Sequence, residues 1–458
     1  MALHTNFGSP FVLILTAITF LFVFQQSSAV SATSNSTSTP PKGIVLRVTK
    51  DPATLQYITL VHQRTPLVPI KLAVDLGGGS LWVSCGAEDH YVSSSFSHVD
   101  CTSTLCPLAR GTPDCADHCV FHQIHLPNCT TTACWSFTFN PFGGKLDADG
   151  EIIQDVLVFR STSPGGKAVS APNFVFTCVP SPFKGALAPG VKGVAGLGSA
   201  YPALPSQLGR IFNFPSNFLV CLSSSTKANA GAVVFGDLGR FPALVNDDMY
   251  KSMINTPIIK SPFGNATPLG REFTEYYVGL TSIKVNGKVV PINATLLSID
   301  ELQGYGGTKI STAHPYTVVE RSIYQAVVKA FVEKLPSTVT RITPPVEPFG
   351  ECFKGINNLN SVPSIDFVFQ NKKIAWRISG SNSMARINKD VTCLAIVELA
   401  TFISPSPELE FERESAITIG AHQMEEHLLV FDLQSSMIGI SPSLVSRKTT
   451  CANFNSKY

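Results

Sequence analysis

Short apolar runs separated by turn residues fill most of this chain and restrict its fold more than any other feature. Runs of this length, rich in Val, Ile and Phe and bounded by Gly, Pro, Asn or Ser, are typical of β-strands. The 33 glycines and 32 prolines supply the turns. The pattern therefore predicts an all-β protein with few short helices. The predicted strands cover residues 44–49, 56–61, 70–75, 80–84, 156–159, 173–178, 232–236, 276–285, 365–369, 373–378, 393–397, 416–420, 427–433 and 437–441.

Helical periodicity occurs in two places. Apolar residues recur at three- and four-residue steps from Tyr316 to Leu335, which predicts a helix over that stretch. A shorter helix is predicted after Leu204, with Ser206 as its N-cap residue.

Length and charge limit the class of protein. The 458 residues are enough for one large two-lobed molecule with a sizeable core. Charged residues make up 14% of the chain and the net charge is +2, so nothing favours nucleic acid or an anionic membrane as a partner.

The N-terminus has the features of a secretory signal. Phe11 to Phe24 is an apolar run too short for a comfortable membrane span, and Ser27-Ser28-Ala29 offers small residues for cleavage, with Ala32 as a second candidate. We therefore expect a signal peptide at residues 1–29, a disordered mature N-terminus at residues 30–43 and a secreted protein. A retained membrane anchor is the alternative.

Secretion determines how the twelve cysteines are interpreted, because an oxidising compartment favours disulfides, here six. Histidines accompany the cysteines between Cys101 and Cys134, so a zinc site is the alternative there, but disulfides are favoured and no metal is expected. Candidate glycosylation sequons start at Asn35, Asn128, Asn265 and Asn293. The cysteines are Cys85, Cys101, Cys106, Cys115, Cys119, Cys129, Cys134, Cys178, Cys221, Cys352, Cys393 and Cys451.

An acidic residue, Asp75, stands at the end of an apolar run and is followed by Leu76-Gly77 and then by Leu81-Trp82-Val83. An Asp-x-Gly turn is common by itself. Here, further landmarks follow in order, at residues 193–198, 205–208, 310–313, 417–420 and 430–433. This ordered set resembles that of pepsin-like aspartic proteases, and the resemblance covers roughly residues 44 to 445.

The resemblance implies a bilobal acid-protease fold, with an N-terminal lobe at residues 44–245 and a C-terminal lobe at residues 246–458. In such enzymes two carboxylates share one proton and activate a water molecule. Asp75 would be the first, but Ser311 stands where the second belongs, and Ala313 replaces a glycine of the family. The Tyr-Gly-Asp-Gly motif of the flap is also missing, and Phe137–Pro141 occupies its region.

Serine cannot act as a base near neutral or acidic pH, so the resemblance implies a proteolytically inactive site in which Asp75 accepts hydrogen bonds within its loop. Two alternatives keep a reaction open. One is a residual aspartic protease that uses Asp75 alone. The other pairs Ser311 with His314 as nucleophile and base, although these two residues need not face each other.

Within the plant branch of this family, the chain is most similar to a group of extracellular inhibitors. The group includes cereal xylanase inhibitors, xyloglucan-endoglucanase inhibitor proteins, the carrot dermal glycoprotein and the legume basic 7S globulins. The resemblance implies a secreted cell-wall protein, without a cofactor, that binds a microbial endoglucanase or xylanase. It leaves the oligomeric state open. The residues that carry the resemblance lie at 311–313, 315–320, 381–384, 420–423 and 431–433.

Inhibitors of this group place side chains from C-terminal loops in the substrate cleft of their target, where a cation would meet paired carboxylates. The corresponding loops, residues 400–415 and 336–348, hold Arg413 and Arg341. Glu408, Glu410, Glu412 and Glu414 surround Arg413, which favours the alternative of a binding or storage protein similar to the basic 7S globulins. We expect Cys352 to pair with Cys393, which leaves Cys221 for Cys451.

Overall fold

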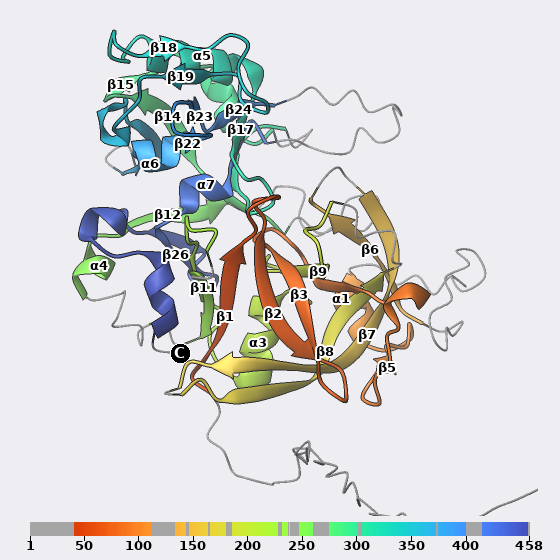
Figure 1. Cartoon of the computed structure of the whole chain (residues 1–458). Helices are drawn as coiled ribbons and strands as arrows, with labels where there is room; N and C mark the ends of the chain where they lie inside the picture. The colour runs from red at the N-terminus through yellow and green to blue at the C-terminus, as the bar shows by residue number, and fades with distance from the viewer. Residues whose placement is uncertain are drawn as a thin grey trace, which may run out of the picture. The chain divides into compact units, whose positions relative to one another are not determined.

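The computed structural model describes residues 41–110, 133–142, 146–163, 165–179, 186–227, 231–236, 238, 247–259, 274–300, 305–371, 374–399 and 415–456. They belong to one compact unit that begins at Pro40 (Figure 1). The predicted signal peptide, Arg413 and the sequons at Asn35, Asn128 and Asn265 lie outside the described residues.

Strands form most of the unit, and each predicted apolar run coincides with one or two of them. The strands of the first half are β1 (Gly43–Lys50), β2 (Tyr57–Gln63), β3 (Val68–Asp75), β4 (Leu81–Ser84), β5 (Ser97–His98), β6 (Trp135–Asn140), β7 (Leu146–Ser161), β8 (Ala168–Val179), β9 (Val191–Gly196), β10 (Phe218–Cys221) and β11 (Gly231–Gly236). Those of the second half are β12 (Ile254–Ile259), β13 (Tyr276–Val278), β14 (Leu280–Val285), β15 (Lys288–Val289), β16 (Thr308–Ile310), β17 (Thr317–Val319), β18 (Thr340–Arg341), β19 (Cys352–Lys354), β20 (Ile365–Phe369), β21 (Ala375–Ile378), β22 (Met384–Arg386), β23 (Thr392–Leu394), β24 (Ile396–Glu398), β25 (Ile417–Ile419), β26 (Leu428–Asp432) and β27 (Met437–Ile440).

Helices are short in the described part of the chain, as expected. They are α1 (Leu105–Arg110), α3 (Leu204–Phe212), α4 (Asp247–Lys251), α5 (Arg321–Val332), α6 (Gly380–Ser383) and α7 (Ala421–Met424), with 3-10 turns η1 (Ala87–Asp89), η4 (Ala294–Leu297), η5 (Leu359–Ser361), η7 (Val445–Arg447) and η8 (Cys451–Ser456).

Three predicted boundaries were wrong. The helix expected from Tyr316 begins only at Arg321, because residues 317–319 form β17 and the side chain of Glu320 then caps the free backbone N–H groups of Ser322 and Ile323. The N-cap of α3 is Ala203 instead of Ser206, since Pro205 fits the first helical turn, where its missing N–H has no intrahelical partner. The run at residues 276–285 is two strands that are separated at Gly279.

The two halves of the chain repeat one topology that residue identity does not reveal. In the first half, β3 lies parallel to β9, and β4 returns antiparallel to the same strand. In the second half, β16 lies parallel to β25, and β17 returns antiparallel to it. The end of β3 carries Asp75 and the end of β16 leads into Ser311, so the two motif segments occupy corresponding places.

Strands from both ends of the chain build one antiparallel ribbon. Its order is β1–β11–β10–β26–β27–β12, and each neighbouring pair is antiparallel. Phe218 of β10 stacks on Phe431 of β26, with the ring centroids 4.6 Å apart. The ribbon therefore brings together strands that are far apart in the sequence, such as β10 and β26.

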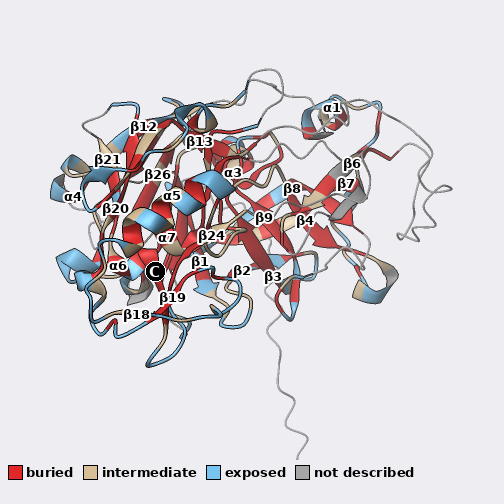
Figure 2. Cartoon of the chain, turned by 90° about the horizontal axis from the view of Figure 1, so that it is seen from above, coloured by how far each residue is buried: buried red, intermediate tan, exposed pale blue. Residues whose placement is uncertain are grey.

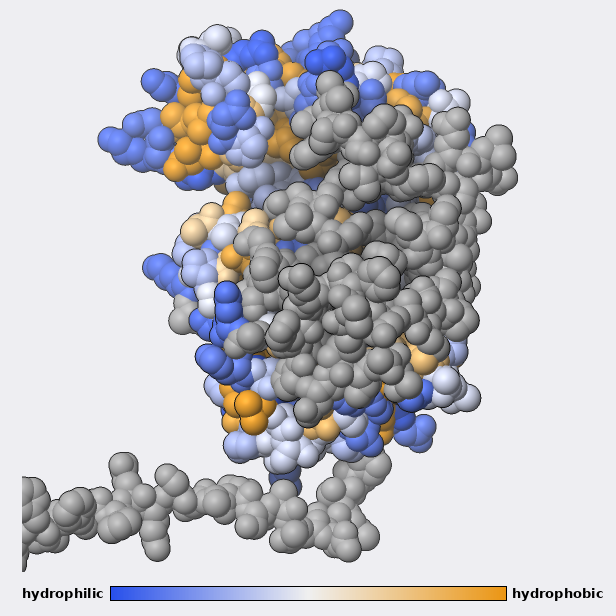
Figure 3. Space-filling model, turned by 90° about the vertical axis from the view of Figure 1, so that its right-hand side faces the viewer, coloured by the Kyte–Doolittle hydropathy of each residue, from blue (hydrophilic) through white to orange (hydrophobic). Residues whose placement is uncertain are grey.

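The core consists of apolar side chains from these strands, including the aromatic rings of Tyr57, Phe174, Phe235 and Trp376. Buried residues follow the strands, whereas exposed ones lie on one side of α5 and at loops (Figure 2). The described residues on the face in Figure 3 are mostly hydrophilic, with small separate apolar groups. No helix among the described residues is long and apolar enough to cross a membrane.

Four disulfides lie in the described part of the chain: Cys85–Cys178, Cys106–Cys134, Cys221–Cys451 and Cys352–Cys393. The last two are the expected pairs. Cys101 is also disulfide-bonded, and no described cysteine is free. Cys106 and Cys134 are therefore bonded to each other instead of being available as zinc ligands, and no group of described His, Cys, Asp or Glu residues is arranged to hold a metal.

Candidate functional site

Asp75 ends β3 and is nearly buried, with 7% of its surface exposed. The backbone N–H of Gly77 donates to its Oδ1 at 3.1 Å, which makes Asp75 a hydrogen-bond acceptor in its own loop. A Cβ at Gly78 would lie 2.9 Å from Asp75 Oδ2 and 2.8 Å from the Cα of Gly196. Only glycine fits at position 78, because the loop folds directly onto the carboxyl group.

Ser311 takes the corresponding place in the second half. It follows β16, its backbone N–H donates to the carbonyl of Ile419 at 2.9 Å, and 8% of its surface is exposed. Its Oγ accepts from the backbone N–H of Ala313 at 3.1 Å. Asp75 and Ser311 thus bond in the same way, each accepting from the N–H group two residues further on.

Thr312 holds the two loops together. Its Oγ1 accepts from the backbone N–H of Leu76 at 2.8 Å and donates to the carbonyl of Val74 at 2.8 Å. The residues on both sides of Asp75 are therefore bonded to the residue that follows Ser311. This places one carboxyl group and one hydroxyl group at the point where an aspartic protease needs two carboxylates.

A partly buried ion pair that sequence reasoning missed adjoins this point. Lys309 Nζ of β16 lies 2.7 Å from Glu275 Oε1. Glu275 packs over the Asp75 loop, since a Cβ at Gly77 would lie 2.9 Å from its Cγ, and Thr274 donates to the carbonyl of Gly77 at 2.5 Å. One signal was available in the sequence: Lys309 stands next to Ile310, the first residue of the landmark at residues 310–313.

Burial raises the pKa of Asp75 to about 7; the negative charge of Glu275 adds to this, whereas the hydrogen bond from Gly77 and the charge of Lys309 oppose it. Burial disfavours the charged form of Lys309, but Glu275 outweighs it, with Tyr277 and Asp75 acting in the same direction, and the pKa of Lys309 is raised. The site can thus hold a proton on Asp75 near neutral pH. At the place where a protease of this fold has the second carboxylate that shares the proton, this chain has the hydroxyl group of Ser311.

The hairpin of β6 and β7 stands at the position predicted for the flap. Its strands pair from Trp135 with Glu151 to Asn140 with Leu146, although the flap motif of the proteases is absent.

Arg341, one of the two cations proposed for a partner's cleft, lies on β18 with an exposed side chain. Its Nη2 donates to Oε1 of Glu351, which is buried. The charge of Arg341 is therefore compensated within the chain. Arg413 lies outside the described residues.

A second polar cluster, largely buried, surrounds Glu425, which follows α7. Glu425 accepts from Lys50 Nζ at 2.5 Å, from the Tyr57 hydroxyl at 2.7 Å and from His422 Nδ1 at 3.1 Å. Burial raises the pKa of Glu425, but His422 and Lys50 outweigh it and lower this pKa to about 2. The cluster joins β1 and β2 to the segment that follows α7, more than 360 residues further along the chain.

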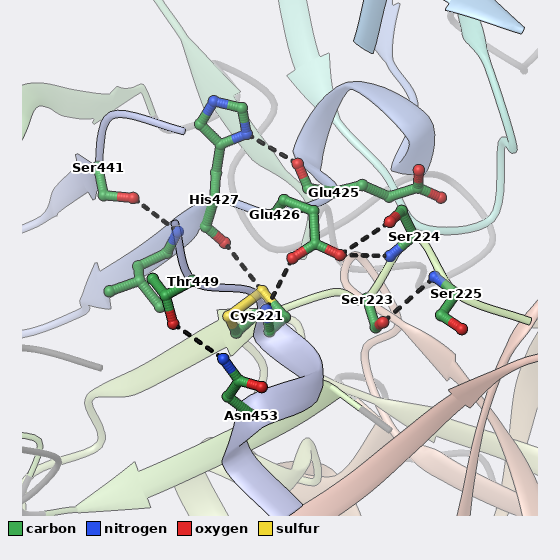
Figure 4. Close-up of a disulfide and its surroundings, with 12 residues drawn as sticks. Cys221, Ser223, Ser224, Ser225, Glu425, Glu426, His427, Ser441, Thr449 and Asn453 are labelled. Carbon is green, nitrogen blue, oxygen red and sulfur yellow. Dashed lines mark hydrogen bonds between the residues drawn. A yellow bond between two sulfur atoms is a disulfide. The ribbon is translucent and has the colours of Figure 1, made fainter. Parts of the chain in front are cut away.

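The next residue, Glu426, lies beside the Cys221–Cys451 disulfide (Figure 4). Its Oε1 accepts from the backbone and hydroxyl of Ser224 at 2.8 and 2.9 Å, and its Oε2 accepts from the backbone N–H of Cys451 at 2.7 Å. His427 donates from Nδ1 to the carbonyl of Glu425 at 2.9 Å, and burial lowers its pKa to about 4.

Fold and site together define a pepsin-like aspartic-protease scaffold with one aspartate of the catalytic pair. Two family models match the chain, Xylanase inhibitor N-terminal over residues 57–237 and Xylanase inhibitor C-terminal over residues 275–442. The chain belongs to the family that these two models describe.

Its relatives are plant proteins that it matches over nearly their whole length. "Probable aspartic proteinase GIP2" of Nicotiana benthamiana is 42% identical, covering 92% of this chain and 93% of the relative. "Gamma conglutin 1" of Prunus dulcis is 39% identical, covering 93% of each. The crystal structure of edgp is 40% identical, with a TM-score of 0.81, covering 92% of this chain and 99% of that chain.

Proposed function

We propose that this protein is a secreted, proteolytically inactive member of its family that inhibits a microbial cell-wall glycoside hydrolase, a xyloglucan endoglucanase or a xylanase. The observation that carries the proposal is that Ser311 occupies the place corresponding to Asp75 in the second half of the chain, because a scaffold without its second catalytic carboxylate is left with binding. The match to both xylanase-inhibitor models supports the inhibitor role.

The inactive state follows from proton transfer. A protease of this kind needs one carboxylate as base and a second carboxyl group as proton donor in the same cycle. Asp75 can hold a proton, but the hydroxyl of Ser311 cannot replace the partner carboxylate. Loss of one member of such a unit lowers the rate by about 10⁴-fold or more.

The inhibitory contact is proposed for the loop that contains Arg413. Arg341 is the second candidate. Glu351 already compensates its charge, so its attraction to the carboxylates of a hydrolase is weaker. We therefore expect Arg413→Ala to weaken inhibition at least about tenfold and Arg341→Ala to weaken it less.

The measurement uses the purified, secreted full chain against a xyloglucan endoglucanase and a xylanase. Arg413→Lys serves as the matched control, because it keeps the charge but not the planar fork of donors. If neither hydrolase is inhibited, the inhibitor role is refuted. Unchanged potency in both alanine variants would refute the assignment of the inhibitory loops.

A binding or storage role is the second candidate. Two observations favour it: the acidic residues Glu408, Glu410, Glu412 and Glu414 around Arg413, and the likeness to "Basic 7S globulin 2" of Glycine max, 33% identical over 94% of this chain. A purified protein that inhibits no hydrolase and cleaves no protein would support this role.

Residual proteolysis by Asp75 alone is the third candidate, favoured by the name of the Nicotiana benthamiana relative. Incubation with a denatured protein at acid pH, with and without pepstatin, tests it. We expect no cleavage, and pepstatin-sensitive cleavage would refute the inactive state.

A further inference from the structure

Phe142 follows β6 by two residues, on the way from β6 to β7, and yet only 3% of its surface is exposed. Its backbone N–H donates to Oδ1 of Asn140 at 3.0 Å, and Asn140 is completely buried. Residues in the connection of a hairpin usually lie on the surface, because loops run over the outside of a protein. The ring of Phe142 packs inward instead.

The apolar cluster that contains Phe142 lies on one face of the strands β3, β9 and β4. Ala73, Val194 and Trp82 are neighbours in the register of these strands, and each is at most 2% exposed. Side chains two residues apart on a strand project from the same face, so Asp75 projects from the face that carries Ala73. Phe142 therefore packs on the side of the sheet to which the carboxyl group of Asp75 points. The other buried members of the cluster are Val179, Ala188 and Val191.

The second motif segment contacts the same cluster. Ala313, two residues after Ser311, packs against it with its methyl group, which a glycine at this position would lack. One cluster thus joins the β6–β7 hairpin to the flanks of both Asp75 and Ser311, and Asp75 itself is only 7% exposed.

We propose that the β6–β7 hairpin is a closed lid, and that Phe142 fills the apolar space beside Asp75 that a bound peptide would need. The hairpin is built to stay in place. Its strands are paired from their base, where the N–H of Ile152 donates to the carbonyl of Cys134 at 2.8 Å and Cys134 is bonded to Cys106. Opening of the lid therefore requires the ring of Phe142 to leave its cluster.

The lid is a barrier of a different kind from the one at Ser311. The hydroxyl group of Ser311 removes the second carboxylate from the reaction, whereas the lid removes access to the first. A carboxylate restored at position 311 would still face a closed cleft. This closure goes beyond the proposed inhibitor role and does not depend on it, because any protein partner would have to bind outside the cleft.

Labelling of carboxyl groups with a water-soluble carbodiimide and an amine, followed by mass spectrometry of the peptides, tests the lid in the full secreted chain. Asp75 should be labelled slowly in the wild type and at least about tenfold faster in Phe142→Ala, because the lid loses most of the packing of one aromatic ring and opens more often. The largely exposed Asp390 should be labelled at the same rate in both proteins. An equal rate for Asp75 in the two proteins would overturn the proposal.

Two controls separate the lid from a general loss of stability. Phe349→Ala removes a ring that is 4% exposed from a separate cluster in the second half, and it should leave the labelling of Asp75 at the rate of the wild type. Asp366 is buried beside Arg377 and should stay unlabelled as long as the chain is folded. If Asp366 is labelled in Phe142→Ala, the milder Phe142→Leu takes its place and should still raise the rate for Asp75. An unchanged rate in Phe142→Leu, or an equal increase in Phe349→Ala, would refute the lid.

Discussion

Asp75 has kept its place in the loop while its chemical surroundings have changed. A carboxylate of a catalytic pair shares its proton with a neighbouring carboxylate, whereas the corresponding place in the second half holds the hydroxyl group of Ser311, and among the described residues the hydrogen bond from Gly77 and the more distant charge of Lys309 favour the ionised form of Asp75. Ionisation of this residue is therefore a cost to the fold.

The pH dependence of stability tests this at Asp75. The pKa of Asp75 is about 7 in the folded protein against an ordinary aspartate value of 3.8. As the pH rises, the unfolded chain releases this proton before the folded chain does. The free energy of unfolding therefore decreases as the pH rises from about 4 to about 7. Asparagine resembles the protonated acid, so Asp75→Asn should be more stable than the wild type at pH 8, by about 2–4 kcal/mol, with the difference vanishing below pH 4.

Urea unfolding of both proteins at several pH values measures the difference. Asp390→Asn is the control, because Asp390 is largely exposed and should show no such dependence. Equal stability of wild type and Asp75→Asn at pH 8 would mean that the ionised group is well solvated.

At the scale of elements, η8 is held to the ribbon by more than its disulfide. Glu426 accepts hydrogen bonds from Ser224, just after β10, and from the N–H of Cys451. One carboxylate therefore links the two chain segments that the Cys221–Cys451 disulfide also joins. Both carboxylate oxygens of Glu426 accept hydrogen bonds from donor groups. The side-chain amide of glutamine would place its own NH2 donor against one of these donors.

Glu426→Gln should therefore lower the free energy of unfolding by about 1–3 kcal/mol, the usual cost of leaving a buried group unsatisfied. Proteolysis should also release the C-terminal residues faster, because η8 loses its cap while the disulfide stays. Glu333→Gln, at an exposed position after α5, provides the control for the loss of one negative charge. A variant as stable as the wild type would show that the disulfide alone fixes η8.

Two buried groups that precede β26 make the stability of the whole molecule sensitive to acid. The pKa of His427 is about 4 in the fold against 6.5, so between these values the unfolded chain takes up a proton that the folded chain does not. Stability should fall by up to about 3 kcal/mol as pH drops through this window. Glu425, whose pKa is lowered to about 2 from 4.5, keeps its contribution until the pH falls below 4.5 and loses it towards 2.

His427→Gln should flatten the decrease between pH 6.5 and 4, as followed by urea unfolding at fixed temperature. The exposed His62 gives the control, and His62→Gln should keep the slope of the wild type. An unaltered slope in His427→Gln would place the acid sensitivity in other groups.

Short apolar runs are local signals, and they predicted strands such as β3, β8 and β26 but not β10, β12 or β16. The ordered landmarks, also local, predicted that Ser311 stands where a second aspartate is expected. The sequence could not predict Lys309 with Glu275, since that pair depends on the alignment of β13 with β16. Lys50 and Glu425 meet only through the ribbon. A sequence pattern does not give the register between distant strands, so it cannot predict contacts that depend on this register. The ion pair beside Asp75 is one of these contacts.

The ribbon also sets the order in which the chain can be completed during synthesis. Strand β10 must wait for β26, and Cys221 must wait for a partner 230 residues further on. Pairings at such separation slow folding, because the loop between them has to close first. Until the last strands leave the ribosome, β10 lacks one of its two neighbouring strands, and a chain that stops before β26 leaves this edge of β10 without its strand partner.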